Sequence, residues 1–112
     1  MSRGEWTVVG RAGDVPLLEG RSVLAGGRRV AVFHLPGGWA AVDHACPHKA
    51  GPLADGIVTE TCVTCPLHGW RFDLRTGLRE GGPEAIAAHE VRVRAGTLEL
   101  RLSAGAPRAE AA

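Results

Sequence analysis

Two short cysteine–histidine pairs constrain what this chain can fold into more than any other feature. Cys46 and His48 form a C-x-H pair, Cys65 and His68 form a C-x-x-H pair, and the sixteen residues 49–64 separate them. Each pair offers one thiolate and one imidazole, which suit an iron–sulfur centre or zinc and poorly suit a hard ion such as magnesium. Proline and glycine flank both pairs and favour tight loops in which backbone N–H groups can approach a bound group. The pattern therefore predicts two ligand loops that share one metal centre.

The order of the ligands separates two kinds of centre. A structural zinc site also accepts two cysteines and two histidines, but its arms more often carry like ligands. Here each arm carries one of each, as in a Rieske centre, where thiolates bind one iron of a [2Fe–2S] cluster and imidazoles bind the other. The pattern resembles the Rieske family, and the resemblance implies one [2Fe–2S] cluster per chain, held by Cys46, His48, Cys65 and His68. A zinc-stapled binding module without a redox role is the alternative from a different class.

Length and composition favour one small domain. A chain of 112 residues can form a single domain, residues 1–112, with a modest core that a metal centre reinforces. The net charge of +1 and the lack of a basic stripe argue against nucleic acid as a partner. No apolar run is long enough to cross a bilayer, and residues 1–5 do not resemble a secretory signal, so we expect no membrane partner. Besides the paired cysteines only Cys62 remains, which excludes a disulfide framework and favours a reducing cytoplasm.

Apolar residues recur with a period of two, which is typical of strands. We expect an all-β, antiparallel domain with strands over residues 6–9, 21–24, 29–35, 39–42, 61–64, 70–74, 89–94 and 97–102. Turns are expected at 36–38, 73–77 and 95–96, and a short helical turn at 84–88. The core should span about residues 5–102, followed by a frayed tail at 103–112. In this small Rieske-type fold the ligand loops form a lobe on a base of strands.

Residues beside the ligands indicate the branch of the family. Rieske proteins of respiratory chains carry an extra cysteine in each ligand loop, which form a disulfide, and a serine and a tyrosine that hydrogen-bond to sulfur. This chain has Gly51 and Leu67 at the cysteine positions, and Trp70 and Phe72 at the positions of serine and tyrosine. Side-chain donors that stabilise the extra electron are therefore missing. The chain resembles the low-potential branch.

Within that branch the chain resembles the small subunit of assimilatory NAD(P)H nitrite reductase. The similarity runs over residues 6–102 and is carried by 46–53, 56–58 and 65–77, although Ala50 stands where that family commonly has glycine. Residues 81–83 match the proline-bearing third loop that shields the cluster. The resemblance implies a one-electron carrier, not catalytic by itself, whose partner is a larger subunit with flavin and siroheme.

A second family fits almost as well. The ferredoxin component of an aromatic-ring-hydroxylating dioxygenase shares the fold and the ligand spacing, and its partners are an oxygenase and a reductase. Residues 49–53 and Trp70 favour the nitrite reductase family. The chain has no G-x-G-x-x-G dinucleotide motif and no Ser-His-Asp set of its own.

Four further features need an interpretation. Cys62 forms a C-x-x-C with Cys65 but lies on an alternating strand, which favours a buried apolar thiol. Trp70 follows a ligand loop and is expected to pack beside the cluster and exclude water, whereas Trp6 and Trp39 are expected in the core. Basic residues gather around the second loop and could dock an acidic partner or form an ordinary solvated face: Lys49, Arg71, Arg75 and Arg79. His44 is the one remaining histidine near the ligands in sequence.

Overall fold

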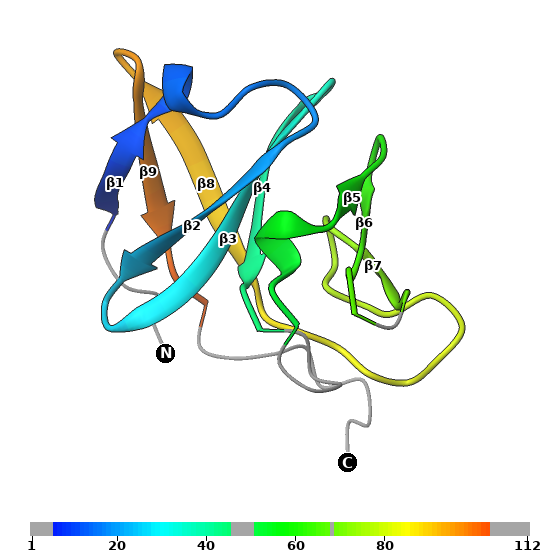
Figure 1. Ribbon diagram of the computed structural model, residues 1–112. Coiled ribbons are helices and arrows are strands. Elements are labelled where there is room, and N and C mark those ends of the chain that lie inside the picture. The colour runs from blue at the N-terminus through cyan, green and yellow to red at the C-terminus, as the bar shows by residue number, and fades with distance from the viewer. Residues whose placement is uncertain (1–5, 46–50, 68, 104–112) are drawn as a thin grey trace.

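A computed structural model describes residues 6–45, 51–67 and 69–103, and these residues form two antiparallel sheets (Figure 1). The larger sheet has the order β1-β9-β8-β4-β3-β2, and the smaller has the order β5-β6-β7. The strands are β1 Thr7–Arg11, β2 Gly20–Ala25, β3 Arg28–Leu35, β4 Gly38–Asp43, β5 Ile57–Val58, β6 Cys62–Thr64, β7 Arg71–Asp73, β8 Ala88–Arg94 and β9 Thr97–Arg101. Two 3₁₀ helices, η1 Ala12–Asp14 and η2 Leu53–Asp55, complete the elements. The predicted all-β fold is confirmed.

The middle of the large sheet is buried on both faces. Along β3, Val30 and Val32 join one core cluster, with Leu98 and Leu100 of β9. The intervening β3 side chains, with Phe33 among them, join a second cluster on the other face. A strand covered on both sides reads as a continuous apolar run instead of an alternating one, which explains why β3 is the most apolar stretch of the chain.

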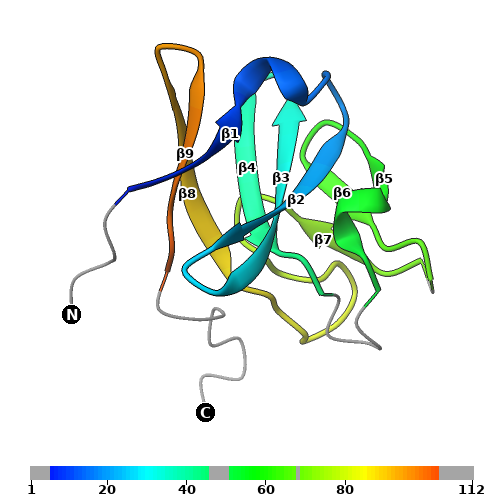
Figure 2. The ribbon, with the colours of Figure 1, turned by 60° about the vertical axis from the view of Figure 1, so that its left-hand side comes forward.

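The small sheet stands beside β3 and β4, on the side away from β1 and β9 (Figures 1 and 2). Phe72 of β7 and Val63 of β6 enter the same cluster as Phe33 and Val42 of the large sheet. The helix η2 packs where the two sheets meet. The second core cluster therefore joins the ligand-loop lobe to the strand base, as the sequence predicts.

The hairpin of β8 and β9 forms as expected, although burial alternates along β9 and not along β8. Its outer face carries cross-strand ion pairs. Arg92 donates to Glu99 at 2.7 Å and Arg101 donates to Glu90 at 2.5 Å. The Arg92 guanidinium carbon lies 4.0 Å from the centre of the Trp6 ring. Trp6 thus covers a charged surface and is only half-buried, so the expectation that it belongs to the core is wrong.

Trp39 is also only half-buried. Its ring stacks on His34 with centroids 4.1 Å apart and planes 7° apart. The His34 ring in turn bonds the Val15 carbonyl at 2.9 Å. Trp39 therefore packs against the edge of the core, and its expected place inside the core is not confirmed.

The expected helical turn at 84–88 does not form. Ala85 instead makes an antiparallel bridge with Leu78, and Ile86 donates its N–H to the Gly77 carbonyl at 2.8 Å. Ile86 is buried in the core, so pairing across the loop outweighs the local helix preference. In the described part of the chain no helix is long and apolar enough to cross a membrane.

The first residue of the expected tail is held to the domain by a hydrogen bond. Ser103 falls within the expected frayed tail, yet its backbone N–H donates to the His89 ring at 3.0 Å. Residues 104–112 of the expected tail lie outside the described residues.

Candidate metal centre

Of the four expected ligands, the structure describes Cys65. It directly follows β6, is 2% exposed, and belongs to the core cluster between the two sheets. Cys46, His48 and His68 lie outside the described residues. The site is therefore built here from Cys65 and from the segments that enter and leave both loops.

The second ligand loop is closed by its own backbone. The Cys65 N–H donates to the Trp70 carbonyl at 2.7 Å, and the Gly69 N–H donates to the Cys65 carbonyl at 3.1 Å. Gly69 has a φ of +76°, a conformation that glycine adopts at no steric cost. The glycine after the C-x-x-H pair is therefore required by the turn that returns the chain to β7.

The first ligand loop is closed at its base by His44 and residues of η2. Ala45 bridges Pro52, and the Leu53 N–H donates to the His44 carbonyl at 2.9 Å. The His44 ring accepts a further bond from the Ala54 N–H at 3.3 Å. Burial lowers the pKa of His44, which favours the neutral ring that can accept this bond. His44 therefore holds the two ends of the loop together.

Gly51 brings the two loops into contact. A Cβ atom built on Gly51 would lie 2.5 Å from the Cys65 sulfur and 3.2 Å from Cγ of Leu67. Only a residue without a side chain fits against the Cys65 sulfur, so the base of the first loop lies directly beside a ligand of the second. This contact between the loops is consistent with a centre that takes ligands from both of them. Gly51 and Leu67, which replace the two bracing cysteines of respiratory Rieske proteins, also lie next to each other.

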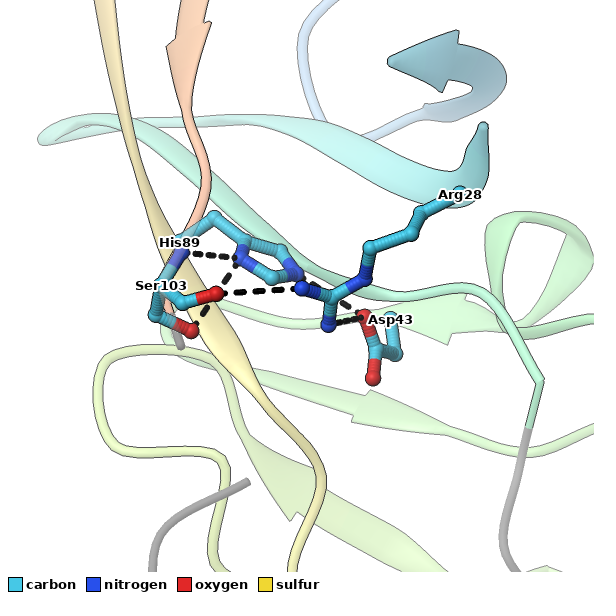
Figure 3. Close-up of polar contacts among 4 residues, drawn as sticks. All are labelled: Arg28, Asp43, His89 and Ser103. Carbon is cyan, nitrogen blue, oxygen red and sulfur yellow. Dashed lines mark hydrogen bonds and ion pairs between the residues drawn. The ribbon is translucent and has the colours of Figure 1, made fainter. Parts of the chain in front are cut away.

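A half-buried polar network, with His89 buried at its centre, anchors the strand that leads into the first loop (Figure 3). Asp43, at the end of β4, accepts from Nε2 of His89 at 2.8 Å and from Arg28 at 2.9 Å. Nδ1 of His89 accepts from the Ser103 N–H at 3.0 Å, so we assign the ring proton to Nε2. Arg28 also donates to the Ser103 carbonyl at 3.0 Å. The network joins the start of β3, the end of β4, β8 and Ser103, which lies two residues after β9.

The Asp43 carboxylate is the charged centre of this network. Burial raises its pKa, but the hydrogen bond from His89 and the charge of Arg28 outweigh burial and bring the pKa below its ordinary value. Sequence reasoning missed the network, because Asp43 and His89 are 46 residues apart and no local pattern links them. The one signal in the sequence was the charged residue Asp43 at the end of an otherwise apolar strand.

Trp70 lies beside the second loop as expected. It packs against the core cluster that contains Cys65, and its ring is tilted by 48° against Phe72 with centroids 6.4 Å apart. The guanidinium carbon of Arg79 lies 3.6 Å from the centre of the Trp70 ring on the third loop's side. Arg79 also donates to Glu84 at 2.8 Å.

Cys62 is a buried thiol, as predicted. It is 7% exposed, and its sulfur donates to Glu80 at 3.0 Å. Burial raises the pKa of the thiol, and the hydrogen bond to Glu80 raises it further. A raised pKa disfavours the thiolate that binds metals, so Cys62 is not suited to be a ligand.

Three of the four basic residues near the second loop are paired. Arg71 lies 3.6 Å from Glu80, Arg75 lies 3.2 Å from Asp73, and Arg79 lies 2.8 Å from Glu84; Lys49 is outside the described residues. Each carboxylate offsets the charge of its arginine. The pairs thus favour the solvated-face interpretation over a docking surface for an acidic partner.

The fold and the described parts of the loops define a class of protein: a small two-sheet β domain with a buried cysteine, Cys65, in the core cluster between its sheets. Comparison with known families identifies it, because the model of the Rieske [2Fe-2S] domain matches residues 5–93. The chain belongs to the Rieske [2Fe-2S] domain family. Its cofactor class is therefore the [2Fe–2S] cluster, and it is an electron carrier of the Rieske kind.

Relatives of two kinds cover nearly the whole chain. The anthranilate 1,2-dioxygenase ferredoxin subunit of Burkholderia cepacia is 30% identical over 88% of this chain and 93% of its own length. A structure from Mycobacterium tuberculosis, provisionally assigned as the small subunit of an NADH-dependent nitrite reductase, has a TM-score of 0.83 at 25% identity, over 93% of this chain and 99% of that one. A complex of reduced oxygenase and oxidised ferredoxin in carbazole 1,9a-dioxygenase has a TM-score of 0.77 at 26% identity, over 86% of this chain and 92% of that one. Some longer relatives are matched over only 11 to 12% of their length.

Proposed function

We propose that this chain is the electron-carrying small subunit of an NAD(P)H-dependent nitrite reductase, and that Cys46, His48, Cys65 and His68 hold its [2Fe–2S] cluster. The contact between Gly51 and the Cys65 sulfur carries the proposal, since it joins the bases of both loops at a buried thiol. We further propose that residues 1–112 form a single domain of about residues 5–102 plus a tail. The protein is expected to be cytoplasmic and to bind neither nucleic acid nor membrane.

The chain's own residues would supply the support for one-electron transfer. A bound [2Fe–2S] cluster would accept one electron from a donor and release it to an acceptor. Cys65 would supply a buried thiolate, the hydrogen bonds that His44 accepts and that Cys65 donates would hold the loop bases, and Trp70 would limit the approach of water. The chain is not catalytic alone, so nitrite would be reduced at the siroheme of a larger, flavin-bearing subunit.

The dioxygenase ferredoxin is the second candidate, favoured by the relative that is 30% identical over 93% of its own length. In that case the partners would be an oxygenase and its reductase. The preference for nitrite reductase rests on residues 49–53 and Trp70 and on the structural neighbour with a TM-score of 0.83. Both candidates use the same cluster and the same loops.

Two experiments test the proposal in sequence. The chain is first purified without oxygen, and iron, sulfide and zinc are measured together with the EPR spectrum of the reduced protein. A zinc-bound, colourless protein would support the zinc-stapled module and end the electron-carrier proposal. A deletion strain is then grown on nitrite as the nitrogen source, and lost growth with co-purification of a siroheme protein supports the nitrite reductase role. Normal growth with loss of an aromatic oxygenase activity would identify the ferredoxin instead.

A further inference from the structure

Arg79 has an environment that its ion pair alone does not explain. Its guanidinium carbon lies 3.6 Å from the centre of the Trp70 ring, and Nη1 donates to Glu84 at 2.8 Å. Its side chain is 23% exposed, and its buried Nε has no hydrogen-bond partner among the described residues. An unsatisfied buried donor is unfavourable, so other contacts must determine where this guanidinium lies.

The third loop is shaped to hold the guanidinium in place. A Cβ atom built on Gly82 would lie 2.5 Å from Nη1 of Arg79 and 2.6 Å from Oε1 of Glu84. The Arg79 N–H also donates to the Glu84 carbonyl at 2.9 Å. Gly82 therefore leaves the space that the Arg79–Glu84 pair fills. The pair presses one planar face against Trp70.

Arg79 can act through its positive charge or through its contact with the Trp70 ring. Glu84 lies 2.8 Å from Arg79 and offsets much of its field at longer range. The contact with the Trp70 ring, at 3.6 Å, is not offset in the same way, because it depends on the shape of the guanidinium as well as its charge. The contact of Arg79 with Trp70 therefore matters more than its positive charge.

We propose that Arg79 is a positioning residue, which clamps Trp70 against the second ligand loop and so limits the access of water to the cluster. The proposal rests on the cluster assignment made above. Trp70 is tied to that loop directly, since its carbonyl accepts the Cys65 N–H at 2.7 Å. Loosening the Trp70 ring would open a path for water beside Cys65.

The proposal predicts the direction of the change in reduction potential. Two ferric ions, two sulfides and two thiolates sum to zero charge, so the oxidised centre is neutral and the reduced centre carries one negative charge. Water stabilises the charged form over the neutral one. A loosened Trp70 therefore raises the potential, whereas simple loss of a positive charge would lower it.

Two variants separate position from charge. Arg79→Lys keeps the charge but loses the planar fork, and Arg79→Gln with Glu84→Gln removes the pair with no change in net charge. Both should raise the potential and speed the bleaching of the cluster by an iron chelator, on the order of tenfold for the double variant. The matched control is Arg92→Gln with Glu99→Gln on the β8–β9 hairpin, because the Arg92 guanidinium carbon lies 4.0 Å from the centre of the Trp6 ring and Arg92 pairs with Glu99 at 2.7 Å.

The outcomes are distinct. An unchanged potential and bleaching rate in both Arg79 variants, or equal changes in the control, would overturn the clamp. A third variant, Arg79→Gln alone, removes the positive charge and leaves Glu84. A wild-type potential in Arg79→Lys together with a lowered potential in Arg79→Gln would mean that the charge of Arg79, and not its position, is what matters. Because iron, sulfide and EPR are first measured on the wild-type chain, absence of the cluster there refutes the proposed function, whereas a loaded wild type with unaffected variants refutes only the clamp.

Discussion

Replacing Gly51 with alanine tests the contact on which the metal centre depends. The new Cβ would lie 2.5 Å from the Cys65 sulfur, about 1 Å closer than ordinary van der Waals separations of roughly 3.5 to 4.0 Å. The φ of Gly51 is not in the left-handed region, so the backbone accepts alanine and the effect is steric. Either the Cys65 sulfur or the base of the first loop must move.

The magnitude follows from two opposing effects. Overpacking of a tight site typically costs about 1 to 3 kcal/mol, while replacing glycine by alanine at a permitted conformation returns about 0.4 to 1 kcal/mol through the unfolded state. The steric cost is the larger of the two. We expect a net loss of about 1 to 2 kcal/mol in the free energy of unfolding, and a larger loss of cluster content, since a displaced thiolate cannot meet the iron.

The assay compares iron and sulfide content, visible absorbance and denaturant unfolding of wild type and variant. Gly37→Ala is the matched control, because a Cβ atom at that position would have no heavy atom within 4 Å and the φ of Gly37 is also outside the left-handed region. That control should load a full cluster and be slightly more stable than wild type. If Gly51→Ala behaved like Gly37→Ala in content, absorbance and stability, the two loops would not meet at Cys65 as described.

Three further predictions concern the ligands, the network and the third cysteine. His68→Cys should lower the potential, because a thiolate brings a negative charge that neutral imidazole does not, and voltammetry with an unchanged value would remove His68 from the ligand set. Asp43 has a pKa below its ordinary value of 3.8, so its stabilising effect is complete above that value and is lost as pH falls through the folded-state pKa. Asp43→Asn should cost about 1 to 2 kcal/mol at pH 7 and flatten the acid limb of unfolding free energy against pH; a limb as steep as in wild type would contradict this. Cys62→Ala should keep full iron and sulfide content, and a colourless product would make Cys62 a ligand after all.

Most strands could be predicted from the sequence because their signals are local. The hairpin of β8 and β9 alternates along each arm, and Ala95-Gly96 marks its turn with positive φ at both residues. The two-residue strand β5 was missed, because it exists only by pairing with β6. The expected helical turn near Ile86 was wrong for a similar reason, since a distant carbonyl and a place in the core outweighed local preference.

The same distinction between local signals and tertiary contacts applies to the candidate site. The identity of its ligands follows from residue type and spacing, since thiolate and imidazole in a fixed order select a class of centre wherever the loops lie. The pairs Asp43–His89 and Gly51–Cys65 follow from no spacing rule, because residues far apart or on separate loops meet only after both sheets have packed.

The all-β class, the resemblance to Rieske proteins and the lack of hydroxyl donors at Trp70 and Phe72 could be predicted from the amino-acid sequence. These properties depend on residue type and on periods of a few residues. The need for a residue without a side chain at position 51, and the place of Arg79 over Trp70, became visible in the folded molecule alone. Such contacts depend on how segments distant in the chain share one small space, and close packing sets that space for the molecule as a whole.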